Sequence, residues 1–497
     1  MKKAFKIISL VLCLCLLFSA CSGEKGNEEN SSDEEINTSL QNSETDNDGF
    51  NGNVALPYNK TDGLNPFFAR SYENLYICSL MYQPLYSVDS GYTVNTVIAE
   101  NLNVSDNIVM VRIRQGVSFK DASYITADDV VYSFNKAKES YAWAESLNEV
   151  VSAQAVGRYA VEFTMTHKDI YVAGKLNFPV VKAGTADTED VIPVGSGNYY
   201  YAEDKLVNTL NNKKILSLVS IGTRDSVENA MTIDAVDVFF NDMSNCNYTT
   251  TTATMQDVQL NNMVYLGLNS ANGALNNTIR NAIAARLDSD KIALSSYQGH
   301  ATAMKLPFNP QSGLVNEVTA IKTVGDKDLA NKIIDRCGYT RYSGSAKTNG
   351  AYTLALSIIV NKDNNFRVAA AYNIADALNE CGFLISVQSL PFDEYVQRIK
   401  SGNFDMYLGE VKLDYTMDIG QFFNQNSMLS AGIDVDSEIA TEYFRFRAGE
   451  ITPAEYYEVF VEQYPFVPIV FRKGYVLTSD ELKLNLKEIP YSLYSGL

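Results

Sequence analysis

Residues 361–423 decide the fold of this chain; they read NKDNNFRVAAAYNIADALNECGFLISVQSLPFDEYVQRIKSGNFDMYLGEVKLDYTMDIGQFF. Apolar side chains at helical spacing predict a helix that ends at Gly382. A β-type run at 383–390, an amphipathic helix at 392–399 and a second strand at 403–409 follow. Strand, helix and strand in this order predict parallel pairing with a right-handed crossover, and therefore an α/β fold.

The end of the second strand is predicted to form a binding edge. In sheets with parallel strands, ligands bind beyond the carboxyl ends of the strands, which is where residues 410–418 lie. The whole stretch resembles the second lobe of the extracellular solute-binding proteins of the peptide/nickel class (family 5), which feed ABC importers.

The resemblance extends through most of the chain and keeps the family's order. Its clearest part is 101–138, NLNVSDNIVMVRIRQGVSFKDASYITADDVVYSFNKAK, in which Thr126 and Asp129 are predicted to form a capping box. Lys120 and Ala122 stand where the family has His and Gly, and Ala122 predicts a turn without a positive φ. Looser matches lie at 53–66, 72–85, 192–201, 264–292, 329–360 and 464–476.

This resemblance implies a two-lobed, periplasmic-binding-protein-like α/β fold with an enlarged first lobe and a ligand cleft between the lobes. The implied limits are 51–266 for the first lobe, to which 465–497 returns, and 267–464 for the second lobe. Residues 264–269 are the predicted hinge. The length of 497 residues agrees with several domains, because a single core rarely grows so large.

The N-terminal residues 1–20 are predicted to be a targeting segment, with three lysines ahead of an apolar run. The letters LFSAC at 17–21 resemble a bacterial lipobox, with Phe18 where the family prefers Leu. The resemblance implies that Cys21 is lipidated and anchors the protein on the outer face of the cell membrane. A plain signal peptide is the alternative. Residues 21–50 hold nine acidic side chains and one lysine, which predicts a disordered tether.

Composition excludes several functional classes. A net charge of −19 argues against nucleic acid or an anionic membrane surface as the main partner. The chain has only two histidines, His167 and His300, and no HExxH or G-x-S-x-G motif. We therefore predict a protein that is not an enzyme and that holds no metal or cofactor.

Four of the seven cysteines fall outside the N-terminal segment, and their spacing is not that of a metal site. Buried thiols are the favoured interpretation, although an extracytoplasmic location permits disulfides. The pairing stays open for Cys78, Cys246, Cys337 and Cys381.

Residues 409–419, GEVKLDYTMDI, supply the candidate ligand site. They resemble a family segment in which an Asp holds the α-ammonium of a bound peptide, and the match assigns that role to Asp414, with Tyr415 beside it. Capping of the loop is the alternative for Asp414. Val411 replaces the family's Trp, which removes a wall of the pocket. Arg367 lies near the position where short-peptide binders hold the ligand carboxylate; an ordinary surface arginine is the alternative.

The resemblance predicts a monomeric, lipid-anchored protein that closes two lobes around a peptide and delivers it to a permease with its ATPase. One alternative keeps the fold but binds a nickel chelate, a sugar or another small solute. A second is a surface receptor without transport.

Overall fold

A computed structural model describes residues 54–212, 214–222, 224–244, 254–318, 321–479, 482, 493–494 and 497. The predicted targeting segment, the tether, Cys21 and Cys246 lie outside these residues. Residues 50–497 form one compact unit. Within the described part of that unit, no helix is long and apolar enough to cross a membrane.

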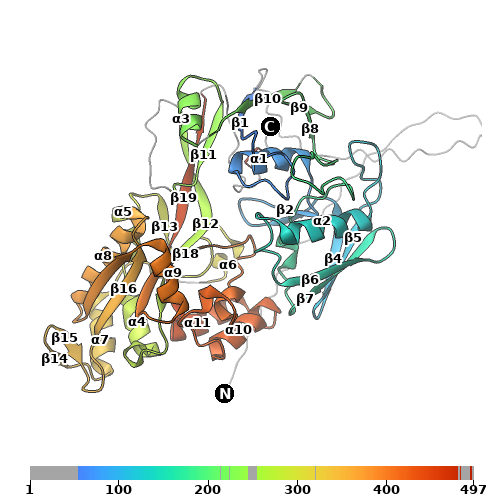
Figure 1. The fold of residues 1–497 in the computed structure, drawn as a ribbon. Helices are drawn as coiled ribbons and strands as arrows, with labels where there is room; N and C mark the ends of the chain where they lie inside the picture. Colours follow the sequence, from blue (N-terminus) through green and yellow to red (C-terminus); the bar gives the residue numbers. More distant parts are fainter. Residues whose placement is uncertain are drawn as a thin grey trace, which may run out of the picture. The chain divides into compact units, whose positions relative to one another are not determined.

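The N-terminal half of the unit contains three small sheets. The first is β1 (Val54–Tyr58), β10 (Ile215–Ser220), β9 (Lys205–Asn208) and β8 (Tyr199–Ala202), in that order. The second is β4 (Ala99–Ser105), β5 (Ile108–Ile113), β7 (Ala160–Met165) and β6 (Val150–Ala155); the third is β2 (Tyr86–Val88) with β3 (Val94–Thr96). Helices α1 (Tyr72–Met81) and α2 (Ala127–Glu139) accompany these sheets (Figure 1). The short η1 (Val172–Gly174) belongs to the same half.

The start of α2 confirms one prediction and corrects another. Asp129 Oδ2 accepts hydrogen bonds from the backbone N–H and the hydroxyl of Thr126, at 2.9 and 2.8 Å, so the predicted capping box is present. The expectation that Ala122 would not adopt a positive φ is wrong, because its φ is 67°. The turn is held by hydrogen bonds between Phe119 and its neighbours Ala122 and Ser123, which impose the left-handed conformation on a residue with a Cβ.

The C-terminal half is organised around one mixed sheet of seven strands. Its order is β11 (Val238–Asn241), β19 (Phe466–Thr478), β12 (Thr254–Leu268), β18 (Met406–Lys412), β16 (Ala355–Asn361) and β17 (Leu384–Leu390), with β13 (Ala301–Ala303) added to β19. Strand β16 lies between β17 and β18 and pairs in parallel with both. The two strands of the strand–helix–strand pattern are therefore parallel, as predicted, but they do not pair directly with each other, because β16 is inserted between them. The second strand begins and ends three residues later than predicted, so 410–412 are still strand. A separate hairpin consists of β14 (Arg341–Ser343) and β15 (Ala346–Thr348).

The remaining described helices belong mostly to this second half. They are α3 (Arg224–Thr232), α4 (Asn277–Arg286), α5 (Ser289–Ser295), α6 (Gly313–Asn316), α7 (Lys327–Arg336), α8 (Asn365–Asn379), α9 (Phe392–Lys400), α10 (Glu438–Arg447) and α11 (Pro453–Gln463), with short turns η2 (Gly273–Leu275), η3 (Gly420–Phe423) and η4 (Met428–Ser430). The helix predicted to end at Gly382 and the helix predicted at 392–399 are therefore present as α8 and α9, although α8 ends three residues earlier, at Asn379.

Two groups of buried apolar side chains result. The first core is formed mainly by residues 54–218, and the second core mainly by residues 221–477. Strands β12 and β19 run side by side along both cores (Figure 1). Val258 and Leu260 of β12 pack on the first core, and the strand contributes to the second core from Met263 onward. The predicted lobe limits and the hinge at 264–269 stay predictions.

The three described cysteines outside the tether are free thiols. Cys78 and Cys381 are buried, and Cys337 is half-buried. Burial raises the pKa of the Cys78 thiol, with Asp62 adding to the rise. A buried thiol of this kind is an apolar packing group, which agrees with the favoured interpretation of the sequence.

Candidate functional site

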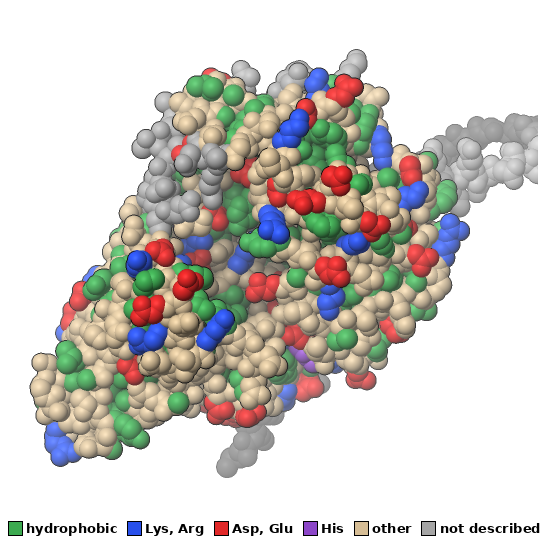
Figure 2. Space-filling view, in the orientation of Figure 1, with side chains coloured by type: hydrophobic (Ala, Val, Ile, Leu, Met, Phe, Trp, Pro, Cys, Tyr) green, Lys and Arg blue, Asp and Glu red, His purple; other side chains and the backbone are tan. Residues whose placement is uncertain are grey.

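A cleft of about 360 Å³ opens between the two cores. Side chains from the first core line one wall, and the loop after β18 lines the other. Figure 2 shows a hollow on this face of the unit, with acidic and basic side chains around it. The main lining residues are Arg70, Tyr72, Tyr141, Trp143, Glu145, Asn148, Lys175, Asn177, Val411, Lys412, Asp414, Tyr415, Asp418 and Gln421.

The loop of residues 413–419 is fixed from both sides. Leu413, Met417 and Ile419 point into the second core and anchor it there. Asp414 Oδ1 caps the turn, accepting from the backbone N–H and hydroxyl of Thr416 at 2.9 and 2.8 Å and from the N–H of Asp418 at 3.1 Å. The second carboxylate oxygen of Asp414 is left to face the cleft.

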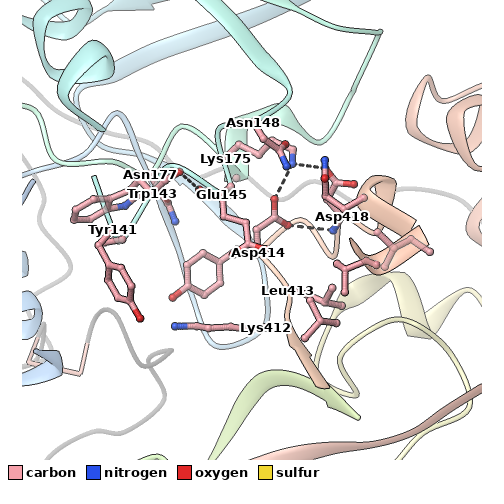
Figure 3. Close-up of a pocket in the computed structure, with 18 of the residues that line it drawn as sticks. Tyr141, Trp143, Glu145, Asn148, Lys175, Asn177, Lys412, Leu413, Asp414 and Asp418 are labelled. Atoms are coloured by element: carbon pink, nitrogen blue, oxygen red, sulfur yellow. Dashed lines mark hydrogen bonds and ion pairs between the residues drawn. The ribbon is translucent and has the colours of Figure 1, made fainter. Parts of the chain in front are cut away.

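An ammonium from the opposite wall occupies this position. Lys175 Nζ lies 2.7 Å from Asp414 Oδ2 and 2.5 Å from Asp418 Oδ2, as Figure 3 shows. The Lys175 side chain is 1% exposed, against 8% for Asp414 and 12% for Asp418. Lys175 directly follows η1, and Gly174 allows the two walls to approach, because an added Cβ there would lie 2.8 Å from Thr416 Cγ2.

Pairing, rather than burial, decides the charge states of these groups. Burial alone would lower the pKa of Lys175, but the carboxylates of Asp414 and Asp418 outweigh it and raise that pKa. Burial would likewise raise the pKa of Asp418, but Lys175 and then Arg447 lower it. Lys175 and Asp418 are therefore charged at neutral pH.

A second buried ion pair lies behind the first. Arg447 of α10 donates to Asp169 Oδ2 at 2.6 Å, and both side chains are at most 1% exposed. Arg447 also donates to the carbonyl and the hydroxyl of Thr416, at 2.8 and 3.0 Å, and its guanidinium lies 4.9 Å from the ring centre of Tyr171. The segment that carries Asp169 and Lys175 therefore makes two buried charged contacts with the second-core side of the cleft, one through each residue.

The opposite end of the cleft is aromatic. Tyr141 and Trp143 lie on the first-core wall, with Lys412 and the second-core loop across from them (Figure 3). Burial by the cleft walls raises the pKa of Glu145, and the charge of Asp414 adds to the rise. The cleft therefore combines flat apolar surface with amide, acidic and basic groups, a mixture suited to an amphipathic small ligand.

The structure brings together three of the four sequence-predicted ligand residues. Asp414, Tyr415 and Val411 all line the cleft. Arg367 does not; its Nε lies 3.8 Å from Glu410 Oε2. The predicted roles of these residues toward a ligand stay predictions.

Sequence reasoning missed Lys175, Trp143 and the pair of Asp169 with Arg447. Lys175 is 239 residues from Asp414, so no local spacing connects them. Trp143 could have been singled out as a candidate site residue because it is the only tryptophan in the sequence.

Among the described residues, no cluster of three or more His, Cys, Asp or Glu side chains is arranged to hold a metal ion. His167 contacts Glu149 at 3.3 Å and His300 contacts Asp257 at 3.6 Å, and neither histidine lines the cleft.

Two cores joined by a pair of long strands, with a polar and aromatic cleft between them, define a two-lobed solute-binding fold. The model of the bacterial extracellular solute-binding proteins, family 5, matches residues 93–214 and 221–429. The chain therefore belongs to that family, a class of extracellular binding proteins of ABC importers, as the motifs of the sequence indicate.

Named relatives agree with this assignment. The oligopeptide-binding protein AppA of Bacillus subtilis is 22% identical over 444 residues, which are 81% of this chain and 79% of AppA. The crystal structure of AppA with a nonapeptide superposes with a TM-score of 0.57 at 17% identity, covering 89% of this chain and 98% of AppA. A nickel ABC transporter structure from Bacillus halodurans has a TM-score of 0.70 at 16% identity, covering 87% and 96%. These likenesses confirm the predicted two-lobed α/β fold.

Proposed function

We propose that this protein captures peptides in the cleft between its lobes and delivers them to an ABC permease and its ATPase. It does so as a monomer, without catalysis, on the extracytoplasmic face of the membrane. Cys21 carries the lipid anchor, and residues 21–50 form the tether between anchor and binding unit.

The composition of the cleft carries this proposal. Trp143, Tyr141 and Tyr415 provide apolar area, and Asn148 and Gln421 provide donors and acceptors. An extended peptide presents both kinds of surface, since its backbone needs hydrogen bonds while its side chains need tolerant pockets. The likeness to an oligopeptide-binding relative over most of the chain supports the same ligand class.

The residues proposed to contact the ligand lie at the end of β18 and in the loop that follows it. Val411 of the strand and Tyr415 of the loop supply apolar surface, and Asp414 supplies the acidic group. In this proposal Arg367 reaches the ligand carboxylate only if its contact with Glu410 is exchanged for that ligand.

A smaller solute is the competing candidate, because proteins of nickel transport share the fold. Arg70 and Lys412 line the cleft and would suit a chelate that carries carboxylates. A chelate would bind without any contribution from peptide length, which separates the two candidates. A surface receptor without transport would bind a ligand but lack a permease and ATPase encoded beside its gene.

The test is ligand-dependent thermal unfolding of protein shown to be free of copurified ligand, with mixed di- to hexapeptides and with nickel–histidine as the comparison. A ligand at 100 times its Kd adds about 2.7 kcal/mol to stability, enough for a clear shift. Stabilisation by peptides supports the proposal. No shift with free or N-acetylated peptides, alongside a shift with the chelate, would overturn it.

A further inference from the structure

The ammonium of Lys175 joins two parts of the molecule that are far apart in the sequence. Its neighbours Val172 and Leu176 are buried in the first core, whereas Leu413 and Met417 fix the acidic loop to the second core. The contact therefore crosses the cleft. It places a primary ammonium against a pair of carboxylates, the same chemistry that the free amino terminus of a peptide would offer.

The oxygen of Asp414 that faces the cleft is already paired with an ammonium. Oδ1 of Asp414 takes three protein donors, from Thr416 and Asp418, and Oδ2 takes Lys175. A ligand ammonium at Oδ2 would lie beside the like charge of Lys175 and be repelled by it, so it would have to replace Lys175.

Asp418 is nearly as fully engaged. Its Oδ1 accepts from the N–H of Gly420 at 2.7 Å and from the hydroxyl of Tyr443, and its Oδ2 accepts from Lys175. Neighbouring charges give a displaced Lys175 no substitute. Arg447 already pairs with Asp169, and the other carboxylate that lines the cleft is Glu145, whose pKa is raised by burial. Displacement would leave a buried ammonium without its partners, which is strongly unfavourable.

We infer that Lys175 is a specificity-determining residue: its ammonium fills the carboxylate site in which a free peptide amino terminus would bind. This inference rests on the proposed peptide capture. It follows that peptides with a free and with an acetylated amino terminus bind alike, and that the ligand chain can continue past the acidic loop.

The discriminating variant carries two changes, Lys175→Met and Asp418→Asn. Together they keep the net charge of the cleft, because one cation and one anion are removed. Asp414 then has one free acceptor facing the cavity, while the amide oxygen at position 418 can still accept from Gly420 and Tyr443. The matched control is Lys182→Met, which breaks a lysine–aspartate pair with Asp121 of 2.5 Å outside the cleft.

Binding is measured on the full-length chain in detergent through the fluorescence of Trp143, the chain's only tryptophan and a lining residue. The probes are one hexapeptide and its N-acetylated form. For the natural chain and the Lys182→Met control we expect equal affinities within about twofold. For the double variant we expect a preference for the free amine of about tenfold or more, the usual effect of a charged hydrogen bond. A tenfold preference in the natural chain, or none in the double variant, overturns the inference.

Chemical labelling of the natural chain decides the case if the double variant does not fold. Lys175 is buried and is expected to resist an amine-acylating reagent with and without saturating free-amine peptide. Labelling of Lys175 that appears only with the free-amine peptide would show displacement and overturn the inference.

Thermal unfolding with methylammonium distinguishes a failure of this inference from a failure of the proposed peptide capture. It should raise the unfolding temperature of the double variant but not that of the natural chain, with sodium chloride as the ionic-strength control. If no peptide changes the Trp143 signal, peptide capture fails. Stabilisation by methylammonium in the double variant alone would still show that Lys175 fills an ammonium site, and equal responses of the two proteins would refute that.

Discussion

Replacing Arg447 by methionine should cost about 4 kcal/mol of unfolding free energy. The change leaves Asp169 as a buried charge without a partner, and such a loss costs about 3–5 kcal/mol. Both groups of the pair are at most 1% exposed and lie 2.6 Å apart, so solvent screens the interaction little. The Thr416 carbonyl also loses its charged donor.

Urea unfolding at neutral pH, followed by circular dichroism, measures this cost. The matched control is Arg445→Met, two residues earlier on α10, because Arg445 is 45% exposed and pairs with the surface residues Glu442 and Glu450. The double variant Arg447→Met with Asp169→Asn leaves no unpaired charge and should recover at least half of the loss. The argument is refuted if Arg447→Met costs no more than Arg445→Met, or if the double variant is less stable than the single one.

Two further predictions concern positions outside the cleft. Ala122→Gly should stabilise the protein by about 1 kcal/mol, because φ is 67° at this residue and a Cβ is disfavoured there; a lower urea midpoint for the variant would contradict this. Burial lowers the pKa of Lys305 to about 8, with Asp288 and Asp290 opposing the shift. Between about pH 8 and about pH 10.4 the Lys305 side chain is protonated in the unfolded chain but neutral in the folded chain. The free energy of unfolding therefore rises with pH over this range, by up to about 3 kcal/mol from this lysine. Lys305→Met should lack this rise relative to the natural chain, and unfolding free energies with the same pH slope in both proteins would rule it out.

The sequence predicts local elements well where their signals are local. The α8–β17–α9–β18 segment follows its apolar periodicity, and the capping box at Thr126 needs only residues three apart. The end of β18 was placed three residues early, because Glu410 and Lys412 look like loop residues. Both are nevertheless paired with β12, and Glu410 is neutralised by Arg472 at 2.7 Å. Tertiary pairing supplies what local composition does not show.

The residues of the candidate site can also be separated into those with a local sequence signal and those without one. Family motifs lead to Asp414, Tyr415 and Val411 because these residues lie close together in the sequence, at the end of β18 and just beyond it. Lys175 and Arg447 could not be predicted, since each meets its carboxylate across hundreds of residues and nothing in a lysine's own neighbourhood marks it as buried. The prediction for Ala122 is wrong because it used the residue type alone. The hydrogen bonds of the turn, which the residue type does not reveal, decide the backbone conformation there.

The position of β19 has a consequence for how the chain folds. This strand lies between β11 and β12 in the large sheet, and Val476, Leu493 and Tyr494 contribute to the first core. A chain that emerges from its N-terminus therefore cannot complete either core until its last thirty or so residues are present. Long-range pairings of this kind delay folding. Neither lobe should therefore reach its full stability before the C-terminal strand has been synthesised and has inserted between β11 and β12.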